Sequence, residues 1–173
     1  MKHCLLLFCL MAFLGCAPCK DCEKKFDPKS NAAKLATKGF PKRKGFVNDY
    51  QNILTAAETA GLEQIMSDFK AKTNNEIVIA IVDGVYPYFG LNGYAMGLSD
   101  YWGVGRDGNG GLSIVLSLQM HKVQVSTSCS TSKNIDKTES QQIVDEVLVP
   151  SFRDKKFFAG FKAALLEIIA KWG

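Results

Sequence analysis

The chain has 173 residues, of which 47% are hydrophobic and 22% are charged, so it can bury one hydrophobic core and is not disordered throughout. The net charge of +4 is unevenly spread: residues 16–44 contain nine basic and three acidic residues, whereas residues 45–173 contain eleven basic and fourteen acidic ones. Because nucleic-acid binding needs a basic face on the folded region, this mildly acidic region argues against a nucleic-acid partner.

Residues 1–15 predict a signal peptide. Lys2 precedes an apolar run over residues 4–14, which is too short for a membrane-spanning helix of about 20 residues. The residues Phe13-Leu14-Gly15-Cys16 resemble a bacterial lipobox, whose cysteine is acylated and becomes the new N-terminus. We therefore expect a lipoprotein of the bacterial cell envelope, attached to a membrane through Cys16, with its domain facing the periplasm or the exterior. Plain secretion, with Cys16 as an ordinary thiol, is the alternative.

Residues 16–44 predict a flexible basic tether, because they are rich in Lys, Asn, Ala and Ser and poor in large apolar residues. The lysines either interact with an anionic membrane surface or belong to a solvated spacer. In an oxidising envelope Cys19 and Cys22 can form a small disulfide, or they can ligate a metal with help from other groups. Cys129 would then be the leftover thiol, although the sequence does not decide the pairing.

The folded domain is expected to span residues 45–173. Thr55 and Glu58 form a capping box before apolar residues at helical spacing, which predicts a helix over about residues 56–72. The β-branched run at 76–83 lacks polar alternation and predicts a strand that is covered on both faces.

The remaining patterns predict three further helices and two further strands. The helices lie over residues 92–102, after a second capping box near residue 138, and over residues 157–172; the strands lie over residues 112–118 and 123–127. Trp102 is expected in the core, at the end of a buried helical stripe. Thr138 and Gln141 predict a second capping box. Pro150 is expected to break or kink the helix that follows this box.

Helices that alternate with buried strands are typical of a layered α/β protein. The crossover through the helix at 92–102 makes the two buried strands parallel. The short connection after residue 118 makes the third strand antiparallel to the second. We therefore predict an α/β three-layer sandwich in which a mixed sheet lies between helices.

A glycine-rich polar loop over residues 103–111 is the candidate site, because glycine permits positive φ angles and close backbone approaches. This loop enters the second predicted strand, and the polar loop at 128–137 leaves the third. Their antiparallel pairing brings four polar residues to one end of the sheet: Asp107, Asn109, Ser130 and Asp136. Asp83 leaves the first strand at the opposite end, and this argument does not place Asp49.

Oxygen-rich side chains suit a hard cation such as calcium. The alternative is an Asx-type turn, in which Asp107 and Asn109 bond to their own backbone. His3 lies in the leader and His121 in a predicted turn, so a Ser-His-Asp triad and a histidine zinc site are poorly supported. Calcium is therefore the one cofactor to consider, and no catalytic residue is assigned.

Six motifs follow one another along nearly the whole domain: Phe46-Val47-Asn48-Asp49-Tyr50 with Leu54, residues 73–81 (Thr-Asn-Asn-Glu-Ile-Val-Ile-Ala-Ile), Trp102-Gly103-Val104-Gly105, Gly111-Leu112-Ser113-Ile114-Val115, Lys122-Val123, and Pro150-Ser151-Phe152-Arg153 with Phe158-Ala159-Gly160. In these motifs the chain resembles the TPM domain family, also called the thylakoid-lumen phosphatase-like or photosystem-repair domain. The resemblance implies a mixed sheet between helices and an anchored or exported protein. The roles it implies are acid phosphatase, metal binding, repair of membrane complexes and receptor modulation.

The sequence departs from the family pattern at three polar places. Asn109-Gly110-Gly111 stands where the family usually has Asp-Asn-Gly. Gln119 and Met120 replace paired acids in the hairpin turn, and residues 126–131 replace a glycine-rich loop. Asp49 and Asp136 are the acids that match the family best.

The loss of these acids and glycines favours a non-catalytic interaction, assembly or repair module for membrane complexes. Its expected partners are the membrane, through the lipid anchor, and an unidentified envelope protein. One alternative is an acid phosphatase, in which a carboxylate acts as nucleophile or positions a metal-bound water. Another is a calcium-binding module without turnover. The candidate metal ligands are Asp49, Asp107, Asn109 and Asp136.

Overall fold

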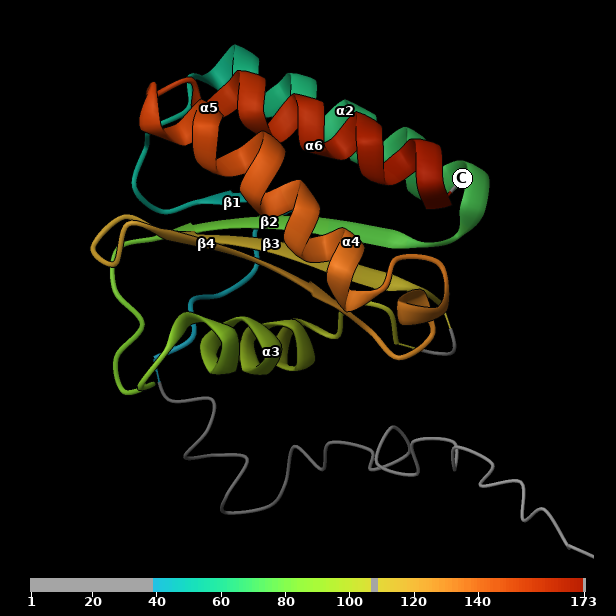
Figure 1. Cartoon of the computed structure of the whole chain (residues 1–173), viewed down its shortest axis with the longest axis horizontal. Helices are drawn as coiled ribbons and strands as arrows, with labels where there is room; N and C mark the ends of the chain where they lie inside the picture. The colour runs from blue at the N-terminus through green and yellow to red at the C-terminus, as the bar shows by residue number, and fades with distance from the viewer. Residues whose placement is uncertain (1–38, 107–108, 173) are drawn as a thin grey trace, which may run out of the picture.

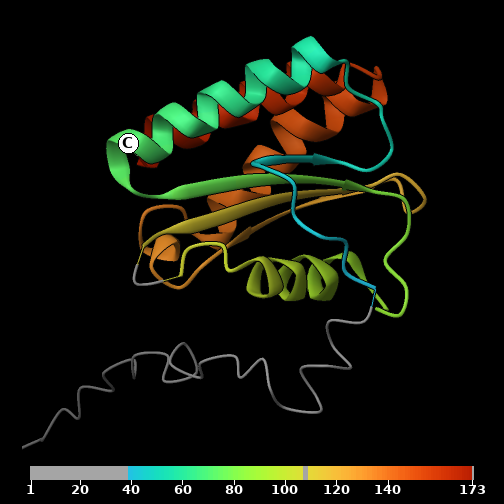
Figure 2. The ribbon, with the colours of Figure 1, turned by 180° about the vertical axis from the view of Figure 1, so that it is seen from behind.

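A four-stranded sheet forms the centre of the computed structural model, which describes residues 39–106 and 109–172. The strands lie side by side in chain order, with β1 to β4 spanning Val47–Asp49, Glu76–Val82, Gly111–Ser117 and Lys122–Thr127. β1, β2 and β3 are parallel, and β4 is antiparallel to β3. Helices cover both faces of this sheet (Figure 1; Figure 2, from behind). The predicted three-layer sandwich with a mixed sheet is therefore confirmed.

The two central strands are buried along their whole length, because helices cover both of their faces. All seven residues of β2 and all seven of β3 are buried, as their continuous apolar runs predict. The sequence does not predict β1, because three residues are too few for a periodic signal; it forms by pairing with residues 79–81 of β2. Three parallel strands thus end at the same end of the sheet.

One face of the sheet is covered by two long helices and a run of short helical segments, and α3 covers the other face (Figure 1). The long helices α2 and α6 contact each other. In the described residues no helix is long and apolar enough to cross a membrane. The bounds of the helices are Ala56–Thr73 for α2, Leu91–Trp102 for α3, Lys137–Gln142 for α4, Val149–Arg153 for α5 and Phe157–Trp172 for α6.

α2 begins at the predicted capping box. The Thr55 hydroxyl accepts from the Glu58 backbone N–H at 3.2 Å, and the Glu58 carboxylate accepts from the Thr55 backbone N–H at 2.8 Å. The helix ends at Asn74, whose left-handed backbone (φ +60°) lets its N–H reach the Lys70 carbonyl at 2.8 Å. Both ends of α2 are therefore set by local sequence, as helix-capping rules require.

The second capping box lies two residues earlier than predicted, so the prediction of Thr138 and Gln141 was wrong. Asp136 and Glu139 form it instead: the Asp136 carboxylate accepts from the Glu139 N–H at 2.8 Å, and the Glu139 carboxylate accepts from the Asp136 N–H at 3.0 Å. An ionised carboxylate is a stronger acceptor than a hydroxyl, which explains why the helix starts after Asp136.

The chain stays helical through Pro150, so the break that was one form of the prediction does not occur. The π-helix η3 (Ile143–Leu148) follows α4 and leads directly into α5, which carries Pro150 in its first turn. Proline has no N–H, and its ring crowds the carbonyl four residues earlier in an α-helix. The wider turn of the π-helix leaves room for that ring, so the helical run ends only at Arg153.

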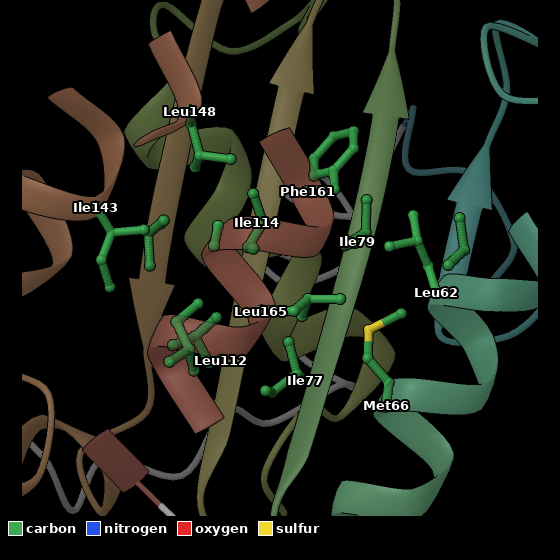
Figure 3. Close-up of a cluster of buried hydrophobic side chains, with 14 of the residues drawn as sticks. Leu62, Met66, Ile77, Ile79, Leu112, Ile114, Ile143, Leu148, Phe161 and Leu165 are labelled. Atoms are coloured by element: carbon green, nitrogen blue, oxygen red, sulfur yellow. The ribbon is translucent and has the colours of Figure 1, made fainter. Parts of the chain in front are cut away.

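The main core fills the space between the sheet and the two long helices. Leu62, Met66, Ile79, Ile114 and Phe161 meet there and are each 0% exposed (Figure 3). Burial of side chains of this size contributes about 1.5–3 kcal/mol each, so this layer supplies most of the apolar stabilisation.

A smaller core lies between the sheet and α3. Ala95 and Leu98 pack there against Val115 of β3. Trp102, predicted as a core residue, is partly buried and packs against this smaller core, and its indole N–H donates to the Pro41 carbonyl at 2.9 Å. This hydrogen bond links the end of α3 to Pro41, in the segment that leads into β1.

Candidate functional site

Two polar loops meet at the end of the sheet where β3 begins and β4 ends. The Ser130 hydroxyl donates to the Asn109 carbonyl at 3.0 Å. The Gly111 N–H donates to the hydroxyls of Thr131 at 2.8 Å and Ser128 at 3.0 Å. The predicted meeting of the two loops is therefore confirmed for Asn109 and Ser130.

The end of α2 joins the same cluster. The Asn74 amide donates to the side-chain oxygen of Asn109 at 3.0 Å, and the Gly110 N–H donates to the side-chain oxygen of Asn75 at 3.0 Å. The Glu76 N–H donates to the Gly110 carbonyl at 2.9 Å. We name this cluster the loop junction: Asn74, Asn75, Asn109, Gly110, Gly111, Ser128, Ser130 and Thr131.

The glycines of this region are required by close backbone approaches. Gly105 has a φ of +72°, and a Cβ there would lie 2.6 Å from the Gly111 Cα. A Cβ at Gly110 would meet the Trp172 ring and the Asn75 side chain. The glycine-rich loop is thus shaped by packing, and its hydrogen bonds lock it onto β3.

Two of the other candidate metal ligands have local structural roles, and one of them, Asp49, lies away from Asn109. Asp49 lies at the opposite end of the sheet, at the carboxyl end of β1, where its carboxylate accepts from the N–H groups of Gln51 and Leu54, each at 2.9 Å. Asp136 caps α4. Asp107 lies outside the described residues. Asn109 and Asp49 therefore do not share a site, and the calcium hypothesis stays a prediction.

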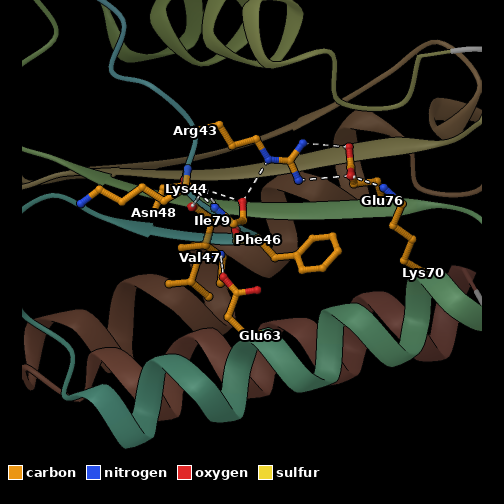
Figure 4. A network of polar contacts seen from close by, with 10 residues as sticks. Arg43, Lys44, Phe46, Val47, Asn48, Glu63, Lys70, Glu76 and Ile79 are labelled. Carbon is orange, nitrogen blue, oxygen red and sulfur yellow. Dashed lines mark hydrogen bonds and ion pairs between the residues drawn. The ribbon is translucent and has the colours of Figure 1, made fainter.

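An ion-pair network that the sequence does not predict lies beside the loop junction (Figure 4). Glu76, at the start of β2, is bound by Arg43 through both guanidinium ends at 3.1 and 3.3 Å and by the Lys70 ammonium at 2.6 Å. Burial opposes ionisation of Glu76, but the hydrogen bonds and charges of Arg43 and Lys70 outweigh it and lower the pKa of its carboxyl. The sequence does contain one indication of this network. Glu76 begins an otherwise apolar strand, and a carboxylate buried at such a position needs a charged or hydrogen-bonding partner.

A polar pocket of about 280 Å³ opens next to this network. Its lining includes the cations Arg43, Lys70 and Arg106 but, among described residues, one carboxylate, that of Glu76. Nor do the described residues contain a group of three or more His, Cys, Asp or Glu side chains that could hold a metal ion. The charge of this pocket therefore suits an anion better than a cation.

One cysteine expectation is corrected. Cys129, expected as the leftover thiol, is disulfide-bonded. Cys19 and Cys22 lie outside the described residues, as does the candidate lipidation site Cys16. The remaining predictions on these three cysteines therefore stay predictions.

Comparison with known proteins gives a family and a fold. A family model of the TPM domain matches residues 47–171. Among solved structures, the N-terminal domain of a protein from P. gingivalis has a TM-score of 0.65 at 19% identity and covers 72% of this chain and 80% of its own. BA42 protein from Bizionia argentinensis has a TM-score of 0.61 at 12% identity, with coverage of 72% and 88%.

The N-terminal domain of cg2496 protein from Corynebacterium glutamicum has a TM-score of 0.59 at 10% identity, covering 78% of this chain and 85% of that chain. At these identities the likeness shows a shared fold alone. A comparison with curated proteins finds no match for the sequence.

Proposed function

We propose that this chain, which belongs to the TPM domain family, is a lipid-anchored, non-catalytic binding module of the bacterial cell envelope that serves the assembly or repair of membrane complexes. The observation that carries the proposal is that the polar side chains of the loop junction make hydrogen bonds to other groups of the protein. Hydroxyls and amides that a catalytic site would direct at a substrate are bonded within the chain.

Thr131 illustrates this use most clearly. It is 0% exposed, and its hydroxyl accepts from the Gly111 N–H at 2.8 Å and faces the Gly111 carbonyl at 3.1 Å. The Thr131 hydroxyl uses its one donor and one of its two acceptor sites on Gly111, and its complete burial keeps it from a substrate. Ser128 likewise accepts from the same N–H. These contacts support a structural role for residues 128–131, which lie where the family usually has its glycine-rich loop.

The hairpin turn gives independent support. Gln119 and Met120 stand where the family usually has paired acids. The Gln119 N–H donates to the Asp83 carbonyl at 3.1 Å, and the Met120 N–H donates to the Ser117 hydroxyl at 3.3 Å. Backbone groups thus close this turn, and the two replaced side chains bring no carboxylate that could act as nucleophile or general base.

Attachment to a membrane is supported by where the chain enters the domain. Phe40 stacks on Tyr88 with ring centroids 5.0 Å apart, on the α3 side of the sheet. Beside this entry, Tyr86 and Phe89 are almost fully exposed, at 90% and 109%, and Met96 is 56% exposed. Exposed aromatic side chains are favourable at a membrane surface, so a lipid on Cys16 would bring a suitable face toward the bilayer.

The disulfide at Cys129 also suits an oxidising envelope.

The anchor is tested by mass spectrometry of the native N-terminal peptide. The proposal predicts a chain that starts at an acylated Cys16 and is released from membranes, or left unprocessed, by Cys16→Ser. A mature chain that starts elsewhere and carries an unmodified Cys16 would refute the anchor.

The absence of turnover is tested on the chain from residue 16 onward, carrying Cys16→Ser, with a generic phosphomonoester across acidic pH. The proposal predicts no hydrolysis above the buffer blank. Hydrolysis that is lost in Asp49→Ala and Asp136→Ala, but retained in Asp68→Ala on the exposed side of α2, would overturn the non-catalytic assignment.

The acid phosphatase remains the second candidate, because the polar pocket beside Glu76 favours an anion. Arg106 lines this pocket, its guanidinium donates to the Asp100 carbonyl at 2.7 Å, and within residues 39–106 and 109–172 it forms no ion pair with a carboxylate. A phosphoryl group is the kind of anion that arginine recognises well. If the phosphatase hypothesis holds, Arg106→Gln abolishes phosphomonoester hydrolysis, whereas the exposed Lys72→Gln leaves it unchanged.

A calcium-binding module is tested by calorimetric titration of the same chain. The cationic lining near Asn109 predicts weak or no calcium binding. A submicromolar dissociation constant would place the calcium hypothesis ahead of the interaction module.

A further inference from the structure

A larger pocket lies at the other end of the sheet and is lined by residues of the β3–β4 turn and of the connection between α5 and α6. Figure 1 shows both connections on the same side of the molecule. Its volume is about 640 Å³, within the range of about 300–1,000 Å³ that is usual for small-molecule sites. Leu116 lies at the end of β3, and Ile53 follows β1, so the pocket borders the carboxyl ends of parallel strands. Open α/β sheets commonly bind their ligands at this end.

The wall of this pocket is apolar. Ile53, Leu118, Phe152 and Phe157 line it, and each is only partly covered by the rest of the protein. A side chain that faces a hollow lacks dispersion contacts on that side and keeps apolar surface in water. A ligand with a flexible hydrocarbon chain would supply those contacts.

The opening of the pocket is cationic. Lys122, Arg153 and Lys155 line it, and no lining residue in the described part of the chain carries a carboxylate. We name these three residues the cationic rim. In residues 39–106 and 109–172 none of their side chains makes a hydrogen bond or an ion pair, whereas Arg43, Lys70, Lys156 and Lys171 are all paired with acids.

Two residues of this opening also hold an unfavourable backbone conformation. His121 has a φ of +50°, and Lys155 has a φ of +58°. The β3–β4 turn, closed by the His121 N–H on the Leu118 carbonyl, and the end of α5, closed by the Lys156 N–H on the Ser151 carbonyl, impose this left-handed region on the two residues. The two turns that carry them bring Lys122 and Lys155 to the same pocket.

The geometry points to a binding site for a free long-chain fatty acid, with the acyl chain on the apolar wall and the carboxylate at the cationic rim. An uncharged hydrocarbon would leave three cations unpaired, and a small anion such as phosphate would leave the apolar wall uncovered. A hollow flanked by two turns accommodates one chain, whereas a bilayer needs a protruding surface. The site is independent of the lipid anchor and would exist in an unanchored chain.

The test uses the chain from residue 16 onward, carrying Cys16→Ser so that it has no acyl group of its own. Calorimetric titration with monomeric palmitate should show saturable binding to a single site. Hexadecanol, which has the same chain without the charge, should bind at least tenfold more weakly, and inorganic phosphate should not compete. Competition by phosphate at similar concentration, or the absence of saturable palmitate binding, would overturn the proposal.

Matched variants locate the site. The triple variant Lys122→Gln, Arg153→Gln, Lys155→Gln should bind palmitate at least tenfold more weakly. The control triple variant Lys72→Gln, Lys133→Gln, Lys137→Gln makes the same change of charge at exposed positions elsewhere and should bind like the parent. An equal loss in both variants would mean that net charge alone attracts the ligand, and would contradict the site.

A bilayer source of acyl chains is distinguished with vesicles of phosphatidylethanolamine and phosphatidylglycerol. The proposal predicts that palmitate binds in the absence of vesicles and that the rim variant sediments with vesicles as much as the parent does. Rim-dependent sedimentation without binding of free palmitate would instead assign the rim to a membrane surface and overturn the proposal.

Discussion

At the amino ends of the parallel strands, polar side chains are bonded to the protein itself. Thr131 holds the backbone of Gly111, and Glu76 is bound by Arg43 and Lys70. At the carboxyl ends, the cationic rim has no partner in the described residues and borders partly covered apolar side chains. The comparison teaches that similar polar side chains serve the fold at one end of the sheet and lie unpaired, in the described residues, at the end where we propose ligand binding.

The largest expected effect at the amino ends comes from Gly105→Ala. The alanine would have to keep the φ of +72° at this position, and its Cβ would lie 2.6 Å from the Gly111 Cα. We therefore expect the free energy of unfolding in urea to fall by about 3 kcal/mol. The control is Gly93→Ala in α3, where a Cβ meets nothing within 4 Å and should stabilise the helix by about 0.5–1 kcal/mol. A loss below about 1 kcal/mol at Gly105 would show that the loop is not locked.

Glu76→Gln is expected to lower the free energy of unfolding by about 2 kcal/mol at neutral pH, because it removes charge-assisted hydrogen bonds to Arg43 and Lys70. The pKa of Glu76 is lowered from its ordinary value of 4.5. Its contribution is therefore present above about pH 4.5 and lost as the pH falls through the folded-state pKa. The exposed Glu146→Gln is the control, and urea melts at several pH values are the measurement. A difference from the parent that stays constant down to acidic pH would contradict the ion-pair account.

Thr131→Val keeps the shape of the side chain and removes its hydroxyl. The Gly111 carbonyl loses its contact with that hydroxyl, and its N–H keeps only Ser128. We expect a loss of about 1–2 kcal/mol in urea melts. The same change at the exposed Thr138 should stay within about 0.5 kcal/mol. Equal effects at the two positions would mean that the junction does not depend on this hydroxyl.

The smallest effect is expected at the carboxyl ends. The triple rim variant Lys122→Gln, Arg153→Gln, Lys155→Gln should change the free energy of unfolding by no more than about 0.5 kcal/mol, because these exposed side chains stabilise nothing in the described part of the chain. Thermal and urea melts check this. A loss as large as that expected for Glu76→Gln would assign the rim a structural role.

Local sequence predicts those parts of the fold that depend on local chemistry. The apolar run of β2 identifies a doubly covered strand, and the Thr55 and Glu58 box identifies the start of α2. The short β3–β4 connection sets an antiparallel pair, which is enough to predict that Asn109 and Ser130 meet.

Features that depend on distant partners are not predictable in this way. Arg43 was assigned to the tether because nothing near it in sequence shows that it binds Glu76, 33 residues away. The carboxylate of Asp136 caps α4 by accepting from the Glu139 N–H, and the prediction that Asp136 is a metal ligand stays a prediction. The apolar pocket joins Ile53 and Leu118, from two separate connections, with Phe157 at the start of α6, so no motif marks it.

The contrast between the two ends of the sheet is tested most directly by following backbone amide signals in an NMR titration with palmitate. The account predicts shifts that saturate at residues 118–123 and 152–157, around the apolar pocket, with signals of the loop junction unchanged. Shifts that concentrate at Asn109, Gly111 and Thr131, with the pocket unaffected, would contradict it.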